Sequence, residues 1–299
     1  MQIRQAILSS LALAVYCVLG ALPGLGDTAP VAVGAQYDST HVYVSPQDVD
    51  RFVSSFIATF GGTASKTIAL TVTPTPSTTE WRFITSPVGT LSVFGFTTPI
   101  PYPFGSERTG YLVTDMDAAL QAAAADGADV IVTPFPDAVG RDAIVEWPGG
   151  LRMQLYWHTV APSYPALATV PENRVYLSPS SASSFLRSFL AFSHGTVTSD
   201  EGRAPGIEIG EPTQTFRRIR IESSFGKMEA LVTNGHLPYP YGRELMGYEV
   251  GDLDATLARA RTSGVTVLDG PYDSDDRRAA IVTFPGGYIA EIHSARPHS

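Results

Sequence analysis

The chain of 299 residues is long enough for two domains of ordinary size, each able to bury its own core. Hydrophobic residues make up 44% and charged residues 16% of it, a globular composition that excludes a largely disordered protein. The net charge of −9 argues against nucleic acid or an anionic membrane surface as the main partner, because both attract basic proteins.

The first residues have the pattern of a secretory signal peptide. Arg4 supplies a positive charge, an uncharged apolar run extends from Ala6 to Leu22, and the small residues 33–35 fit a cleavage site. The alternative is a membrane anchor, because Ile7 to Leu25 approaches the roughly 20 apolar residues that span a bilayer. A Pro-Gly break and the lack of a stop-transfer flank favour cleavage. We therefore expect residues 1–35 to be removed and the mature protein to be secreted or periplasmic, without stable membrane association.

Cysteine chemistry is confined to this segment. The single cysteine, Cys17, lies inside the apolar run. The mature chain is therefore expected to have no disulfide, no zinc–thiolate site and no thiol nucleophile.

The next elements in chain order predict a strand, a helix and three strands. Residues 42–44 form a short β-branched and aromatic run that predicts a strand. Ser45 is then expected to be the N-cap of a helix, with Asp48 three residues later as the second member of a capping box. Apolar residues at helical spacing follow over 49–60, including three phenylalanines that we expect in the core. Strand-like segments then lie at Ile68–Thr73, Trp81–Thr85 and Leu91–Phe96.

A second set of the same elements follows. Tyr111–Val113 predicts a strand, and Asp115 is expected to cap a helix that Gly127 ends. Three strands come next, at Val130–Val132, Ala143–Glu146 and Met153–Trp157. Each set is a β-α-β-β-β unit with one helix, so the sheets must be largely mixed or antiparallel. The sequence therefore predicts an α+β fold and not a doubly wound parallel sheet.

An internal repeat doubles this pattern. Four segments recur in the same order at nearly constant offset. The matching pairs are His41–Pro46 with Arg174–Pro179, Pro101–Gly105 with Pro238–Gly242, Gly110–Asp117 with Gly247–Asp254, and Trp147–Gly150 with Phe284–Gly287. The Pro-bearing stretch 159–171 separates the copies as a linker. We expect a first domain over 37–158 and a second over 172–296.

The motifs of each copy resemble the glyoxalase/bleomycin-resistance/extradiol dioxygenase group, the vicinal-oxygen-chelate superfamily. The resemblance rests on a strand with an Asp-capped helix, a Gly-Ala turn at Gly127 and a Pro-Gly-Gly hairpin at Pro148, all repeated over Tyr248 to Glu291. It covers the chain from Tyr37 to about Ser294. It implies two tandem domains, each a pair of βαβββ units whose curved mixed sheet encloses a cavity. Two such domains resemble the layout of the extradiol dioxygenases.

The resemblance also implies where a metal would be bound, on the first and last strands of paired units. In the first domain these positions carry His41, Ser92, Tyr111 and Gln154, of which only His41 is a good ligand. We expect His41, Tyr111 and Gln154 to contact substrate there.

In the second domain the same positions carry Arg174, Glu229, Tyr248 and Glu291. An arginine facing the cavity would repel a cation and pair with a carboxylate, so Arg174 is expected to contact substrate. His293 follows Glu291 by two residues, so both could face one side of a strand. Glu291, His293 and Glu229 are the candidate metal ligands, and Glu291, Glu229 and Tyr248 the candidate catalytic residues.

Two functions remain open from the sequence. The first is a small-molecule enzyme of the cell envelope, with lyase, isomerase or dioxygenase chemistry and Glu291 or Glu229 as base or ligand. The second is a metal-free protein that binds or sequesters a small molecule, as bleomycin-resistance proteins do. The site is thus expected to hold either one divalent ion (Fe, Mn, Zn or Ni) or none. Either a monomer or a homodimer is compatible with two fused domains.

Overall fold

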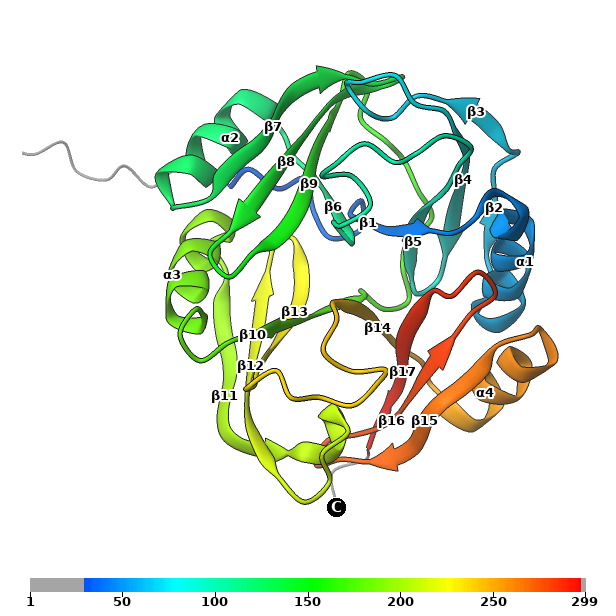
Figure 1. Ribbon diagram of the computed structural model, residues 1–299, viewed down its shortest axis with the longest axis vertical. Helices are drawn as coiled ribbons and strands as arrows, with labels where there is room; N and C mark the ends of the chain where they lie inside the picture. The colour runs from blue at the N-terminus through cyan, green and yellow to red at the C-terminus, as the bar shows by residue number, and fades with distance from the viewer. Residues whose placement is uncertain (1–29, 297–299) are drawn as a thin grey trace, which may run out of the picture.

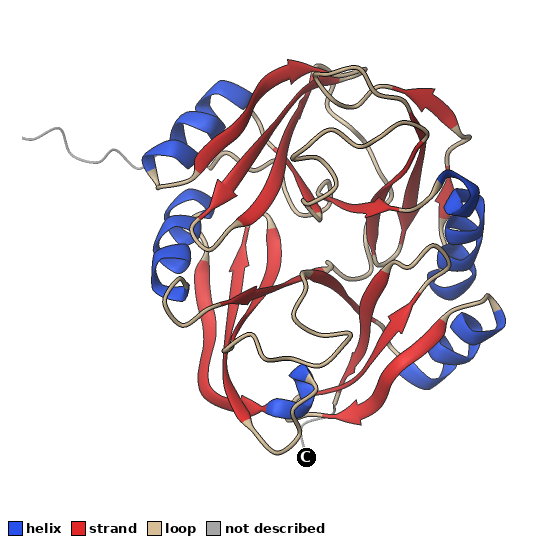
Figure 2. Ribbon diagram, in the orientation of Figure 1, coloured by secondary structure: helices blue, strands red, loops and turns tan. Residues whose placement is uncertain are grey.

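The computed structural model describes residues 30–296, which form two curved β-sheets with helices on their outer sides (Figures 1 and 2). Of the expected signal segment, residues 1–29 lie outside the described part of the chain. Among the described residues, no helix is long and apolar enough to cross a membrane.

The first sheet is built from two βαβββ units. The first unit comprises β1 (Ser39–Tyr43), the one-turn η1 (Pro46–Asp48), α1 (Val49–Phe60), β2 (Thr63–Ala64), β3 (Ile68–Leu70), β4 (Thr79–Ser86) and β5 (Gly89–Phe96). The second comprises β6 (Thr109–Leu112), α2 (Met116–Ala125), β7 (Asp129–Pro136), β8 (Gly140–Trp147) and β9 (Leu151–His158). The strand order is β2-β4-β5-β1-β6-β9-β8-β7, with β3 paired to β4.

The second sheet repeats this arrangement. Its third unit comprises β10 (Glu172–Leu177), α3 (Ala182–Ser193), β11 (Thr196–Pro205), the short η2 (Gly206–Ile209), β12 (Thr215–Ser223) and β13 (Gly226–Val232). Its fourth comprises β14 (Leu245–Glu249), α4 (Leu253–Thr262), β15 (Thr266–Asp273), β16 (Arg277–Thr283) and β17 (Ile289–Ala295). The order is β11-β12-β13-β10-β14-β17-β16-β15, the same topology as in the first sheet.

Both sheets are mixed. The first strand of each unit pairs in parallel with the last strand of that unit, as β1 does with β5 and β14 with β17. The two units of a domain join through an antiparallel pair, β1 with β6 and β10 with β14. The α+β fold expected from the repeat is therefore confirmed.

The helix starts follow the sequence signals with one exception. Asp115 and Asp252 cap α2 and α4 by accepting the N–H groups of Ala118 and Ala255 at 2.7 and 2.9 Å. The predicted capping box at Ser45 is wrong. Its hydroxyl donates to the Asp48 carboxylate at 2.6 Å, because the one-turn η1 precedes the helix and moves its start to Val49.

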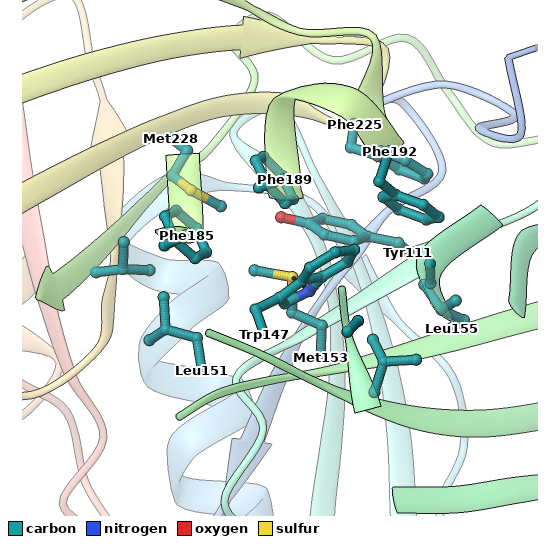
Figure 3. Close-up of a cluster of buried hydrophobic side chains, with 14 of the residues drawn as sticks. Tyr111, Trp147, Leu151, Met153, Leu155, Phe185, Phe189, Phe192, Phe225 and Met228 are labelled. Carbon is teal, nitrogen blue, oxygen red and sulfur yellow. Dashed lines mark hydrogen bonds between the residues drawn. The ribbon is translucent and has the colours of Figure 1, made fainter. Parts of the chain in front are cut away.

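The main cores lie between the helices and the outer faces of both sheets. One core joins the second and third units, where the phenylalanines of α3 pack against Trp147, Tyr111 and Met153 (Figure 3). The ring centroids of Trp147 and Phe192 are 5.0 Å apart, and those of Tyr111 and Phe225 are 4.7 Å apart. A second core joins α1 of the first unit to the fourth unit. The phenylalanines predicted over 49–60 thus pack in the second core and those of α3 in the first, and both sets hold the two domains together.

The two loops that contain the repeated segments Pro101–Gly105 and Pro238–Gly242 pack onto the inner side of their sheets. Phe104 contacts Phe135 and Ile144, and Tyr241 contacts Ile281 and Ile289. In Figure 1 both loops cross the space enclosed by their sheet. The interior of each domain is therefore partly filled by its own connector.

Candidate functional site

Charged side chains line the inner face of the second sheet. Because strand residues alternate between faces, Glu172, Arg174 and Tyr176 of β10 point one way and Val175 and Leu177 the other. Arg174 is in register with Glu229 of β13, and Gly247 of β14 with Glu291 of β17. This pairing brings carboxylates from three strands around one arginine.

The buried charge cluster consists of Glu172, Arg174, Glu229, Arg277 and Glu291. Arg174 Nη1 lies 2.7 Å from Glu229 Oε1, 3.1 Å from Glu291 Oε1 and 3.2 Å from Glu172 Oε1. Three carboxylates from three strands thus converge on one guanidinium nitrogen. Glu229 and Glu291 are completely buried and Arg174 is 1% exposed, so water screens these contacts little.

Arg277 provides a second cation to the same carboxylates. Its Nη1 lies 2.8 Å from Glu172 Oε1 and 3.1 Å from Glu291 Oε1, and its Nη2 lies 3.3 Å from Glu229 Oε2. Two arginines therefore face three glutamates, and each glutamate contacts both. A buried cluster with this geometry depends on every member, since removing one charge leaves the buried charges of its partners less well compensated.

The pKa values of these carboxyl groups reflect a balance of burial and charge. Burial acts to raise the pKa of Glu291, but Arg174 and the His293 imidazole outweigh it and lower the value to about 2. The pKa of Glu172 is likewise lowered well below its usual range by Arg277 against burial. At Glu229 burial prevails over Arg174 and the pKa is raised.

His293 lies beside this cluster. Its Nδ1 is 3.1 Å from Glu291 Oε1, and the residue is 7% exposed. The structure therefore brings together Glu229, Glu291, His293 and Arg174, four of the residues singled out in the sequence.

A divalent metal does not fit the second domain. The point where the carboxylates converge is occupied by Arg174 Nη1, and a second guanidinium lies alongside. A cation there would have to displace Arg174 Nη1 from the three carboxylates and would then lie in contact with the guanidinium group of Arg277. Within residues 30–296, no three His, Cys, Asp or Glu side chains are placed to hold a metal ion.

Tyr248 and Tyr111 lie away from the site. Both point to the outer faces of their sheets, where Tyr248 packs with α1 and α4 and Tyr111 with Phe225. The inner-face neighbours on these strands are Gly247 and Gly110. A Cβ at Gly247 would lie 3.4 Å from Arg174 Cδ, so the glycine leaves room for the arginine.

Two members of the cluster were missed in the sequence. Glu172 precedes Arg174 by two residues and so shares its face, a signal that strand alternation could have supplied. Arg277 precedes Arg278, which repeats Arg141 of the first domain but forms an exposed pair with Asp254. Only the register of β16 with β17 distinguishes the two arginines.

Residues 37–158, all of which the structure describes, contain no comparable cluster in the first domain. His41 is buried, and its Nδ1 lies 3.6 Å from Glu107 Oε1. Gln154 forms a hydrogen bond with Asp142 that acts to lower the pKa of this carboxyl group, but burial outweighs it and raises the pKa. Of the positions equivalent to Arg174, Glu229, Gly247 and Glu291, only His41 is a good metal ligand. The set His41, Ser92, Gly110 and Gln154 therefore does not fit a divalent metal either.

A cleft of about 190 Å³ opens beside the buried charge cluster. Its walls include Glu172, Arg277 and His293 from the cluster side, and Arg220 and Lys227 from β12 and β13. Arg220 forms ion pairs with Asp276 at 2.7 Å and with Glu229 at 3.0 Å. Its third guanidinium nitrogen, Nη2, has no hydrogen-bond partner among residues 30–296. The cleft is thus polar, and its guanidinium and imidazole groups line it together with the carboxyl groups of Glu172, Glu222, Glu249 and Asp276.

The fold is shared with solved structures of known proteins. A variant of 4-hydroxymandelate synthase from Streptomyces coelicolor matches 90% of this chain and 94% of its own length, at 14% identity and a TM-score of 0.59. 2,2',3-Trihydroxybiphenyl 1,2-dioxygenase from Sphingomonas wittichii matches 89% and 91%, at 11% identity and a TM-score of 0.55. The Mn(II)-bound glyoxalase from Novosphingobium aromaticivorans matches 88% and 82%, at 13% identity and a TM-score of 0.54.

These likenesses establish the fold. The chain has the same fold as these proteins over about 90% of its length, with two tandem domains of paired βαβββ units, as its sequence motifs predict. No protein-family model matches the sequence, and no curated protein does.

Proposed function

We propose that this chain is a metal-independent protein of the cell envelope that binds a small polar molecule in the cleft of its second domain. The observation that carries the proposal is the position of Arg174 Nη1 among three carboxylates, where a metal of this fold would otherwise have its ligands. The cleft next to it supports a ligand site, since its walls are charged and its volume of about 190 Å³ suits a compact molecule.

The same geometry disfavours Glu229 or Glu291 as a catalytic base. Both carboxylates are completely buried, and each contacts Arg174 and Arg277. A general base must reach the proton that it removes, within hydrogen-bond distance or through one water. Neither group is among the residues that line the cleft, so binding is the better-supported function.

The proposal is tested by metal analysis combined with ligand titration. The mature chain, purified without chelator and incubated with Fe(II), Mn(II), Zn(II) or Ni(II), is expected to retain well under one equivalent of any of them. Malonate, succinate and benzoate are suitable probes for the cleft, because carboxylates pair with guanidinium groups. At least one should raise the melting temperature of the wild type, and Arg220→Met should abolish the shift.

Arg217→Met provides the matched control for this titration. Arg217 neighbours Arg220 on the same strand but pairs with Asp200 at 2.7 Å, away from the cleft. Its replacement should leave the ligand shift unchanged. Stoichiometric metal in the wild type, or equal ligand shifts in wild type and Arg220→Met, would contradict the proposal.

The cell-envelope location rests on the N-terminal segment, and the structure favours a particular processing point. Val31 is buried in the core that joins the second and third units, and its carbonyl accepts the N–H of Thr114 at 2.8 Å. Ala32 forms a β-bridge with Val113. Cleavage after Ala35 would remove these contacts, so we expect the mature chain to begin at or before Pro30. Intact-mass measurement of the exported protein checks this, and a first residue of Gln36 would contradict it.

A further inference from the structure

A second cleft lies where the two domains meet, away from the buried charge cluster. It measures about 100 Å³ and is lined by His41, Tyr43 and Arg108 from the first domain and by Arg243, Glu244 and Tyr288 from the second. None of the charged residues of the buried charge cluster lines it. Both domains therefore contribute titratable side chains to one small space.

The two arginines of this cleft differ from those of the buried charge cluster. Within the described part of the chain, neither Arg108 nor Arg243 forms an ion pair with a carboxylate. The guanidinium carbon of Arg108 lies 5.8 Å from the centre of the Tyr43 ring, and that of Arg243 lies 5.2 Å from the centre of the Tyr239 ring. Arg108 also donates to the Gly105 carbonyl at 2.8 Å. A guanidinium stacked on a ring still presents N–H donors at its edge, which suit a carboxylate.

Within residues 30–296, two glutamates at the cleft have unpaired oxygens: Glu244, which lines it, and Glu107, which lies beside His41 and Tyr43 but does not line it. Glu244 Oε1 has no hydrogen-bond partner among residues 30–296, and neither does Oε2 of the completely buried Glu107, whose other oxygen accepts from Tyr43. Burial raises the pKa of Glu244 to about 7, and Glu107 adds to the shift, while Asn173 and Arg108 oppose it. A cation placed here would favour the ionised form of Glu244.

His41 adds a further unpaired group. It is 3% exposed, and its Nδ1 has no hydrogen-bond partner, the nearest carboxylate oxygen of Glu107 being 3.6 Å away. A buried nitrogen without a partner is costly unless something binds it. Among the described residues, the cleft thus combines two arginines that form no ion pair, one glutamate with an unpaired oxygen and a buried imidazole.

We propose that this interdomain cleft binds a small zwitterion, an α-amino acid of about the size of glycine or alanine. Its carboxylate would lie between Arg108 and Arg243, and its ammonium group against Glu244. The complementarity follows from the presence of both signs of charge among the residues that line the cleft, and the volume of about 100 Å³ limits the ligand to a few heavy atoms. This site is independent of the second-domain cleft, so either can fail without the other.

The test is calorimetric titration of the full mature chain with glycine, and with acetate and methylammonium as single-charge controls at equal ionic strength. Glycine is expected to bind at least tenfold more tightly than either control. Arg243→Gln and Glu244→Gln should each weaken glycine binding at least tenfold. Arg203→Gln, which changes an exposed arginine on β11, should leave it unchanged.

A second readout separates a binding role of Glu244 from a structural one. Near pH 7, glycine binding should release protons from Glu244, so the observed heat should depend on the ionisation enthalpy of the buffer. This dependence should vanish in Glu244→Gln. No heat with glycine at millimolar concentration for the folded wild type, acetate binding as tightly as glycine, or unchanged binding in both cleft variants would overturn the proposal.

Discussion

Replacing Arg174 with methionine should lower the free energy of unfolding at neutral pH by about 3–5 kcal/mol, the typical cost of removing one partner from a buried ion pair. The variant leaves Glu172, Glu229 and Glu291 buried, with Arg277 as a cation that still contacts all three. Methionine fills much of the lost volume, so the loss measures charge rather than packing. Urea unfolding followed by circular dichroism gives the value.

Arg217→Met again serves as the control for this measurement. Arg217 and its partner Asp200 are 40% and 42% exposed, and exposed ion pairs contribute about 1 kcal/mol or less. A loss in Arg174→Met no larger than that in Arg217→Met would show that the buried charge cluster contributes little to stability.

The loss in Arg174→Met should also depend on pH in a defined direction. The folded-state pKa of Glu291 is lowered to about 2 from an ordinary value of 4.5, so its ionised form contributes stability that is present above pH 4.5. That contribution is lost as the pH falls toward 2. Because Arg174 is the largest cause of the lowering, wild type and variant should converge in stability as the pH falls through this window. A difference that stays constant down to pH 2 would contradict the assignment.

The fold could be predicted from the sequence because its determinants are local and repeated. Asp115 and Asp252 mark helix starts through side chains that cap them, and both recur at the same place in each copy. The helical spacing of the phenylalanines in α1 and α3 places them on the core side, where all are buried except the half-buried Phe60. What the sequence could not give is which units share a core, since contacts such as Trp147 with Phe192 join separate domains.

The site could be predicted only in part, because it depends on strand register. Glu229 and Glu291 face the interior as the family resemblance implies, but Tyr248 lies one position from the inner face and therefore points to the opposite side. A glycine at the inner position carries no chemical signal in a sequence. Arg277 was missed for the same reason, since its neighbour Arg278 is the residue repeated in the first domain.

Arg174→His should convert the second domain into a metal site, the largest change in binding that we expect from one substitution. The substitution removes the guanidinium at the convergence point and places an imidazole where the first domain has His41. In the wild type, oxygens of Glu229 and Glu291 lie 2.7 and 3.1 Å from Arg174 Nη1. In the variant, a divalent ion bound at this point would replace the single positive charge of Arg174 with two. Imidazole and carboxylate ligands suit Mn(II) and Fe(II).

Mn(II) at a free concentration 100-fold above its dissociation constant should stabilise this variant by about 2.7 kcal/mol, because it binds the folded state alone. The wild type should show no such shift, since Arg174 keeps the ion out. Arg277 still contacts Glu172 and Glu291 in the variant and competes with the ion for them. Adding Arg277→Gly should therefore increase the stabilisation by Mn(II); glycine is chosen because the first domain has Gly140 at the equivalent position. If neither variant gains stability with Mn(II), the arginines are not what excludes metal from this fold, and the arrangement of the carboxylates themselves must be the cause.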